Sequence, residues 1–187
     1  RQAMKKRVLF LCTANSARSI MAEALLKHRG GDLFDVFSAG TEPTAVDPRT
    51  LDAIRSLGIP PGELRAKPVE QFVDEHFDFV ITLCSKASQE CRHWPGSGVI
   101  INWDFPDPAA NPDALAFKRT LQEINERIKL FILVNSKHSD LSARAPSTLE
   151  FFKWLSDETR LTALLLIVQA GELCVCELVT ALNLPQP

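Results

Sequence analysis

Apolar residues in the first 134 positions of the chain fall into two patterns. Short unbroken apolar runs, typical of strands buried on both faces of a sheet, predict strands at residues 7–12, 34–38, 77–83 and 99–103. Between these runs, helices are predicted by apolar residues that recur every three or four positions and by Pro or Gly near the segment ends. The predicted helices cover residues 19–29, 48–57 and 114–134.

Strands that alternate with helices are typical of a parallel sheet, because each crossover returns the chain to the same end of the sheet. Helices then cover both faces of such a sheet, which agrees with the apolar character of the predicted strands. Residues 1–134 therefore predict one α/β domain built on a four-stranded parallel sheet.

The pattern changes after residue 134. Residues 135–146 are polar and predict a linker. Residues 147–187 begin with the capping-box spacing of Ser147 and Glu150 and continue with apolar segments that predict three short helices. An all-α segment of about 40 residues is too small to be stable by itself. We therefore expect three parts, with a domain at residues 1–134, a linker at 135–146 and a short helical segment at 147–187.

Composition narrows the range of functions. The chain has 187 residues, of which 45% are hydrophobic and 24% are charged, and its net charge of −2 excludes a globally basic nucleic-acid-binding protein. The longest apolar stretch, near residues 161–168, is too short to cross a membrane, and no segment resembles a signal peptide. Five cysteines, an odd number, favour reactive thiols over a disulfide framework. We therefore expect a cytoplasmic protein.

The main chemical motif is Cys-x5-Arg-Ser, which joins the first predicted strand to the first predicted helix. Backbone N–H groups of such a loop, with the helix N-terminus, converge on a tetrahedral oxyanion. Cys12 would be a nucleophile with a lowered pKa, Arg18 a forked charged donor, and Ser19 a hydrogen-bond partner of the thiolate. The predicted oxyanion-binding residues are Thr13, Ala14, Asn15, Ser16, Ala17 and Arg18. The spacing alone could also arise from a buried Cys and a surface Arg, but the strand–loop–helix context favours catalysis.

Three stretches also resemble a known family. They are VLFLCTANSARSIMAEALL around Cys12, FSAGTEP after the second predicted strand, and a later Asp-Pro motif. Together they resemble the low-molecular-weight protein tyrosine phosphatase fold over about residues 5–134, and within it the thioredoxin-coupled arsenate reductases. The resemblance implies that Asp107, directly before Pro108, is the general acid that protonates the leaving oxygen. Asp104 is the local alternative.

Two further cysteines, Cys84 and Cys91, strengthen the resemblance to the reductases, although either could be an ordinary thiol. Cys84 follows Cys12 by 72 residues, and the Cys-x6-Cys spacing also matches. Phosphatases of this fold commonly carry tyrosines after the Asp-Pro motif, whereas this chain has none. The resemblance implies that Cys12 attacks arsenate and that a disulfide passes from Cys12–Cys84 to Cys84–Cys91.

The same resemblance implies the partners. Arsenate would be the substrate, phosphate and sulfate would be competing oxyanions, and thioredoxin or a similar dithiol would be the reductant. The polar segment at residues 85–90 would be mobile, and no cofactor is implied. Some reductases of the family hold a potassium ion near the loop, and Asn15, Glu23 and Ser38 could contribute ligands. Because residues 65–67 are basic where an acidic ligand would be expected, we predict no metal in this domain.

Residues 147–187 contain the strings LSDETRL, GELCVCEL and LNLPQP, which resemble the first half of an arsenic-responsive winged-helix repressor of the ArsR type. This resemblance implies that Cys174 and Cys176 are thiolate ligands of As(III), and an ordinary buried helix is the alternative. The sequence contains no recognition helix or wing, so DNA binding is not expected. The apolar helix faces could pack on the main domain or form a homodimer.

Three functions follow from these observations. Arsenate reduction for arsenic detoxification, by a Cys12 nucleophile and the three-cysteine relay, explains the largest number of residues. A low-molecular-weight protein tyrosine phosphatase needs only Cys12, Arg18 and Asp107, and it leaves Cys84 and Cys91 without a role. A metalloid-sensing transcriptional regulator, here a fragment fused to a reductase, lacks its recognition helix.

Overall fold

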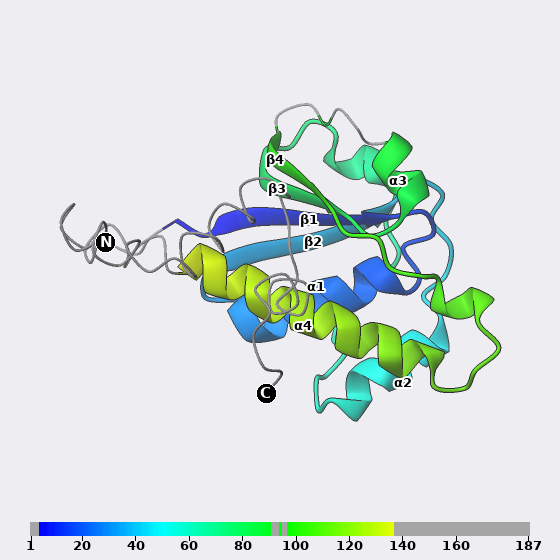
Figure 1. The fold of residues 1–187 in the computed structure, drawn as a ribbon. Coiled ribbons are helices and arrows are strands. Elements are labelled where there is room, and N and C mark those ends of the chain that lie inside the picture. Colours follow the sequence, from blue (N-terminus) through cyan, green and yellow to red (C-terminus); the bar gives the residue numbers. More distant parts are fainter. Residues whose placement is uncertain (1–3, 91–93, 95–96, 137–187) are drawn as a thin grey trace, which may run out of the picture. The chain divides into compact units, whose positions relative to one another are not determined.

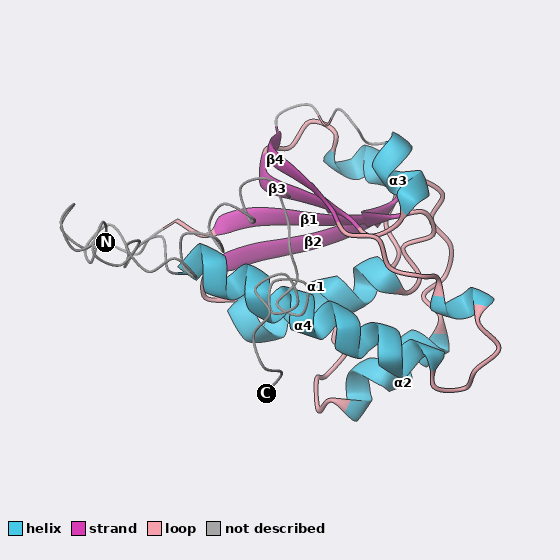
Figure 2. Cartoon of the chain, viewed as in Figure 1, coloured by secondary structure: helices cyan, strands magenta, loops and turns pink. Residues whose placement is uncertain are grey.

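The computed structural model describes residues 4–90, 94 and 97–136, which form a parallel sheet covered by helices (Figure 1). The strands are β1 (Lys6–Cys12), β2 (Phe34–Gly40), β3 (Phe77–Thr82) and β4 (Ser97–Asn102), arranged in the order β2-β1-β3-β4. The α-helices are α1 (Arg18–Gly30), α2 (Pro48–Ser56), α3 (Ser85–Glu90) and α4 (Ala116–Ser136). Two short 3₁₀ helices, η1 (Val69–Phe72) and η2 (Pro108–Ala110), lie in the connections (Figure 2). The predicted four-stranded parallel sheet is confirmed.

Strand β1 lies at the centre of the sheet, which explains its unbroken apolar sequence. It pairs with β2 on one side and β3 on the other, and residues 8–12 are almost completely buried. Because all three strands are parallel, their carboxyl ends meet at one edge, where Cys12 pairs with Gly40 and Leu11 pairs with Thr82. The chain leaves β1 towards β2 and later crosses to β3. The end of β1 is therefore a topological switch point, the usual place for a ligand site in an open α/β sheet.

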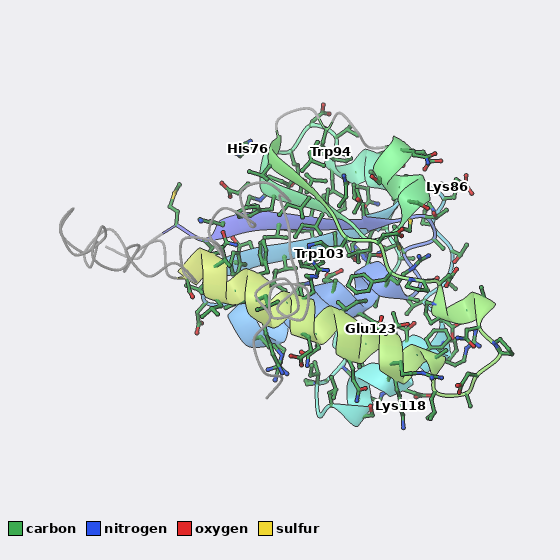
Figure 3. All side chains as sticks on the ribbon, viewed as in Figure 1. His76, Lys86, Trp94, Trp103, Lys118 and Glu123 are labelled. Atoms are coloured by element: carbon green, nitrogen blue, oxygen red, sulfur yellow. The ribbon has the colours of Figure 1, made fainter. Side chains whose placement is uncertain are left out.

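Helices α1 and α4 cover one face of the sheet, and α3 lies on the opposite side (Figure 1). The apolar stripe predicted on α4 is buried, and its members are Phe117, Leu121, Ile124, Ile128 and Phe131. Trp103 lies between the sheet and α4 (Figure 3), with its ring centroid 6.0 Å from those of Phe10 and Phe131. Burial of each such side chain contributes about 1.5–3 kcal/mol, so this aromatic layer holds α4 against the sheet.

The structure differs from the sequence prediction mainly at element ends and at α3. Strand β2 continues to Gly40, because residues 39 and 40 pair with the end of β1. Helix α4 continues to Ser136, two residues into the predicted linker. The polar segment at residues 85–90 forms α3, whose six residues are too few to show a helical apolar repeat. Within the described part of the chain, no helix is long and apolar enough to cross a membrane.

Candidate active site

The Cys12 loop, residues 12–18, joins the buried end of β1 to the first turn of α1. Four of its carbonyl oxygens accept hydrogen bonds from backbone N–H groups in the segment after β2. The pairs are Thr41 N to Cys12 O at 3.3 Å, Glu42 N to Thr13 O at 2.9 Å, Thr44 N to Ala14 O at 3.0 Å and Asp47 N to Ser16 O at 3.0 Å. These bonds fix which way each peptide group of the loop faces.

The N–H groups of the same peptides face the other way, because N–H and C=O point in opposite directions in a trans peptide. The N–H groups of Thr13, Ala14, Asn15 and Ala17 therefore point away from the segment after β2. The backbone N–H groups of Asn15 and Ser19 favour the thiolate form of Cys12 and so act to lower its pKa. The donor side of the loop thus surrounds the thiol, an arrangement that suits a tetrahedral oxyanion.

The tight turn of the loop depends on Asn15 and Gly40. Asn15 has a φ of 47°, in the left-handed region that Asn tolerates better than most residues. Gly40 pairs with Cys12 at the end of β2, and a Cβ atom there would lie 2.5 Å from the Thr13 carbonyl oxygen and 2.9 Å from the Asn15 nitrogen. A side chain at position 40 therefore cannot fit without displacing the backbone of the loop.

The substitution Gly40→Ala tests this close approach. We expect it to lower the free energy of unfolding by about 1–3 kcal/mol, the usual cost of forcing an extra group into a packed region. We also expect kcat/KM to fall about a hundredfold, because an ångström-scale displacement of a catalytic loop has effects of that size. Chemical denaturation and steady-state kinetics measure the two effects. Gly62→Ala is the control for the kinetic effect alone: a Cβ atom there meets no neighbour, although its φ of 58° makes the substitution cost stability as well. Unchanged kinetics in Gly40→Ala would contradict the assignment.

The Cys12 thiol is buried, with 3% of the residue exposed, and its sulfur lies 2.8 Å from the Ser19 hydroxyl oxygen. Burial raises the pKa of Cys12 above its ordinary value. Hydrogen bonds from Ser19 and Asn15 act in the opposite direction, and the charge of Arg18 does so least. The lowered pKa predicted from the sequence is therefore wrong. The physical reason is that the sulfur lies inside the protein, while the Arg18 guanidinium donates to the Phe105 carbonyl at 2.8 Å.

Replacing Ser19 with Ala removes the donor nearest to the sulfur. Since a hydrogen bond to a charged group contributes about 1.5–3 kcal/mol, the pKa of Cys12 should rise by about one to two units. The pH at which iodoacetamide alkylates Cys12 at half its maximal rate should rise by the same amount, followed by mass spectrometry of the Cys12 peptide. Ser16→Ala, in the same loop, serves as the control. An unchanged alkylation profile in Ser19→Ala would show that this hydroxyl does not stabilise the thiolate.

Asp107 reaches the Cys12 loop from the connection between β4 and α4. One carboxylate oxygen, Oδ1, accepts a hydrogen bond from Ala109 N at 3.0 Å and so caps η2. The other, Oδ2, lies 3.6 Å from Nη2 of Arg18, and the Asp107 side chain is 48% exposed. Asp104 is exposed and makes no hydrogen bond or ion pair within the described residues. The geometry therefore favours Asp107 over Asp104 as the acid beside the loop.

Cys84 lies directly beside the Cys12 loop. It follows the end of β3, is 6% exposed, and its sulfur is 3.5 Å from the Thr13 hydroxyl oxygen. The sulfur also accepts a hydrogen bond from Ala87 N at 3.4 Å, so Cys84 caps α3. Lys86 of α3 pairs with Glu42, at 2.8 Å, and so ties α3 to the segment after β2. Figure 3 shows Lys86 on the outer side of α3. The structure thus brings a second buried free thiol to the loop that carries Cys12.

Three cysteines with predicted roles lie outside the described residues, namely Cys91, Cys174 and Cys176. The predicted helical segment at residues 147–187 lies outside them as well. Among the described residues, no cluster of three or more His, Cys, Asp or Glu side chains could hold a metal ion. The contact of Thr13 with Cys84 and the close approach at Gly40 could not be predicted from the sequence, because both depend on strand register.

The residues considered for potassium do come together, but they do not fit that ion. Asn15 Nδ2 donates to Ser38 Oγ at 2.9 Å, and Ser38 donates to a carboxylate oxygen of Glu23. The ammonium group of Lys67 lies 3.2 Å from the same Glu23 oxygen, Oε2. A fixed positive charge at the acidic ligand repels a second cation. This arrangement of Lys67, Glu23 and Ser38 therefore does not fit a potassium ion.

The sequence of this chain is similar to a family of known proteins over most of its length. Residues 7–141 match the model of the family described as low molecular weight phosphotyrosine protein phosphatase. An arsenate reductase of Halalkalibacterium halodurans is 38% identical over 132 residues, which cover 68% of this chain and 95% of the relative. An arsenate reductase of Bacillus cereus is 39% identical over 127 residues, which cover 68% of this chain and 94% of the relative.

Several solved structures resemble the fold of this chain. A structure described as an arsenate reductase in the phosphate binding state has a TM-score of 0.63 and 29% identity, and covers 70% of this chain and 98% of its own. The thioredoxin-dependent arsenate reductase of Corynebacterium glutamicum has a TM-score of 0.59 and 28% identity, and covers 75% of this chain and 65% of its own. A tyrosine phosphatase of Erwinia amylovora, with a TM-score of 0.61 and 18% identity over 72% of this chain and 95% of its own, shares the fold.

Proposed function

Because this chain belongs to the low molecular weight phosphotyrosine protein phosphatase family, we propose that it uses the oxyanion-binding loop of that family to reduce arsenate to arsenite. The observation that carries the proposal is the position of Cys84, a second buried free thiol whose sulfur is 3.5 Å from a side chain of the Cys12 loop. Hydrolysis of a phosphoryl group needs no second thiol, whereas a two-electron reduction does. The relatives that are 38% and 39% identical are named arsenate reductases.

The first step is attack of the Cys12 thiolate on arsenic within the loop. The loop N–H groups and the Arg18 guanidinium bind the oxygens of the oxyanion. Asp107 gives its proton to the departing hydroxide, which leaves as water, and a covalent sulfur–arsenic bond results. The closeness of the Asp107 carboxyl to Arg18, at 3.6 Å, and its half-exposed position support this role.

The second step transfers electrons. Cys84 loses its proton and attacks the sulfur of Cys12, and the electron pair of the sulfur–arsenic bond remains on arsenic, which changes from As(V) to As(III). The arsenic product takes up a proton and leaves as arsenite. Two thiols have become the Cys12–Cys84 disulfide, so two electrons are accounted for. Cys91 then attacks Cys84, which restores Cys12 and leaves a Cys84–Cys91 disulfide for thioredoxin or a similar dithiol to reduce.

A second activity of the same site is hydrolysis of a small aryl phosphate. Cys12, Arg18 and Asp107 would supply the nucleophile, the anion donor and the acid that a phosphatase of this family needs. Two contacts support this: Arg18 lies 3.6 Å from Asp107, and the charge of Arg18 acts to lower the pKa of Cys12. Water can resolve a phosphocysteine without Cys84. We therefore propose weak phosphatase activity beside arsenate reduction.

The test of the proposed function is arsenate-dependent oxidation of reduced thioredoxin by the full chain, with hydrolysis of p-nitrophenyl phosphate measured in parallel. We expect thioredoxin oxidation to depend on arsenate and to be inhibited competitively by phosphate and sulfate. Phosphate hydrolysis without any arsenate-dependent thioredoxin oxidation would identify a phosphatase instead.

We propose that residues 1–134 carry the reductase, that residues 135–146 link it to an ArsR-like helical segment at 147–187, and that Cys174 and Cys176 bind As(III). The soft thiolate pair and the neighbouring sequence strings support this assignment. We further propose a homodimer through these helices, no DNA binding, and a reducing, cytoplasmic location that keeps the thiols active. Arsenite titration of Cys174→Ser/Cys176→Ser tests the ligands, and unchanged binding stoichiometry would contradict them.

A further inference from the structure

A chain of hydrogen bonds runs from Glu23 on α1 to the Cys12 sulfur. Ser38 Oγ donates to Glu23 Oε2, Asn15 Nδ2 donates to Ser38 Oγ at 2.9 Å and to Ser19 Oγ at 2.7 Å, and Ser19 Oγ lies 2.8 Å from the sulfur. Asn15, Ser19 and Ser38 are completely buried, and the Glu23 side chain is 5% exposed. Water therefore does not compete for these bonds.

Which group donates in each of these hydrogen bonds follows from the partners at the two ends of the series. The Ser38 hydroxyl hydrogen is used on Glu23, so Ser38 can only accept from Asn15. The amide of Asn15 is fixed because its Oδ1 accepts from Lys67 N at 2.8 Å, which leaves both Nδ2 hydrogens for Ser38 and Ser19. Ser19 accepts from Asn15, and its own hydroxyl hydrogen remains for the Cys12 sulfur. Glu23 thus fixes Ser38 as an acceptor and the Lys67 backbone fixes the Asn15 amide, and together they leave Ser19 as the donor to the thiolate.

Two lysines neutralise Glu23, in different surroundings. Lys27 Nζ lies 2.5 Å from Oε1, with a side chain that is 52% exposed. Lys67 Nζ lies 3.2 Å from Oε2, the oxygen that accepts from Ser38, and its side chain is 12% exposed. Its ammonium also donates to the Arg65 carbonyl at 3.0 Å, and its backbone holds both Asn15 and Gly40. A buried charge pair such as Lys67–Glu23 is far less screened than an exposed one.

We propose that Lys67 is a positioning residue whose ammonium is the built-in cation of this site, holding Glu23 so that the Ser38–Asn15–Ser19 chain donates to Cys12. The inference rests on the proposed role of Cys12 as nucleophile, and it assigns to a side chain the place that the family resemblance would give to a potassium ion. The enzyme therefore does not depend on potassium.

A cavity of about 920 Å³, open to solvent, is lined by Glu23, Lys67 and residues 59–65. Shortening Lys67 to Ala removes the ammonium beside Glu23 and leaves its place connected to this cavity. A monovalent cation from solution can then take the vacated position. The substitution Lys67→Ala should therefore convert a potassium-independent enzyme into a potassium-dependent one.

The experiment measures two rates of the full chain, kcat/KM for arsenate and the rate of Cys12 alkylation by iodoacetamide at pH 7, each in potassium chloride and in choline chloride of equal ionic strength. In the wild type, potassium should change both rates by less than about twofold. In Lys67→Ala, both rates should fall about tenfold in choline chloride. Losses of this size are usual when a residue that orients a reactive group, without touching the substrate, is removed. Potassium or ammonium ions should restore at least half of the loss.

The controls separate the charge of Lys67 from simple packing. Lys67→Arg should retain both rates, whereas Lys67→Met, of similar length without charge, should lose them and gain nothing from potassium. Lys27→Ala should lose less than about threefold, because its ammonium is mostly in solvent. Equal losses of the two rates in Lys27→Ala and Lys67→Ala would overturn the assignment. A severalfold rise of the wild-type rates with potassium would overturn it as well, and this second test needs no variant that could fail to fold. If the Cys12 alkylation rate changes as expected in the Lys67 variants but the wild type does not reduce arsenate, the proposed reductase function would be refuted. The positioning role of Lys67 would still stand.

Discussion

Replacing Cys12 with Ser should lower arsenate reduction by at least about a thousandfold, since loss of the attacking nucleophile generally has effects of that size or larger. A serine oxygen at this position still meets the Ser19 hydroxyl and the loop N–H groups. It cannot form the sulfur–arsenic bond or the disulfide with Cys84, so neither step of the reduction takes place. Thioredoxin oxidation in the presence of arsenate measures the loss.

The structure also indicates how to separate this effect from unfolding. Serine is close in size to cysteine, so the buried end of β1 should keep its packing and the melting temperature should change little. Oxyanion binding should persist, because the loop N–H groups and Arg18 are unchanged, and phosphate should still raise the melting temperature. More than a tenth of wild-type reduction in Cys12→Ser would reject Cys12 as the nucleophile.

The second large effect concerns Cys84, where the two activities should respond differently. Cys84→Ser should lower arsenate reduction about a thousandfold, because no neighbouring thiol can then attack the sulfur–arsenic adduct. Hydrolysis of p-nitrophenyl phosphate should change less than about threefold, because water resolves a phosphocysteine. Serine is also a good helix cap, so it can replace the sulfur that accepts from Ala87 at the start of α3.

Parallel assays of one Cys84→Ser preparation make this comparison, with Ser85→Ala as the control for the start of α3. A loss of stability would reduce both activities together, so the divergence itself is the signal. An equal fall of both activities would show that Cys84 supports the fold of the site and takes no part in electron transfer.

The Cys12 loop could be predicted from local sequence alone. The apolar run that ends at Cys12, the polar loop and the start of α1 are contiguous, so the pattern that predicts the strand and helix also places Cys12 and Arg18 at their junction. Cys84 could be related to Cys12 only through the family resemblance and the spacing of the cysteines, and the parallel register of β1 and β3 then places it at the same edge of the sheet. Asp107 could be proposed through its Asp-Pro motif and a resemblance, but its distance from Arg18 required the structure.

Other parts of the site depend on contacts that the sequence does not contain. The depth at which the Cys12 sulfur is buried decides its pKa, and only the packed structure gives that depth. Helix α3 is too short to produce a periodic signal, and its cap is a cysteine, which capping preferences do not favour. Lys67 and Glu23 are 44 residues apart, and they meet because the segment before η1 runs beside the end of β2. The basic residues near position 67 indicated that a metal would not bind there. No sequence pattern, however, predicted that Lys67 would contact Glu23.

Attack of Cys84 on Cys12 after arsenate has been bound is tested by the variant Cys91→Ser. This variant should release about one arsenite per enzyme and then stop, because Cys91 acts only after the first disulfide has formed. Mass spectrometry after thiol alkylation should then find a protein lighter by two hydrogens, with Cys12 and Cys84 joined and protected from the reagent. Free Cys12 and Cys84 thiols after arsenite release, or many turnovers with thioredoxin as the reductant, would contradict the account.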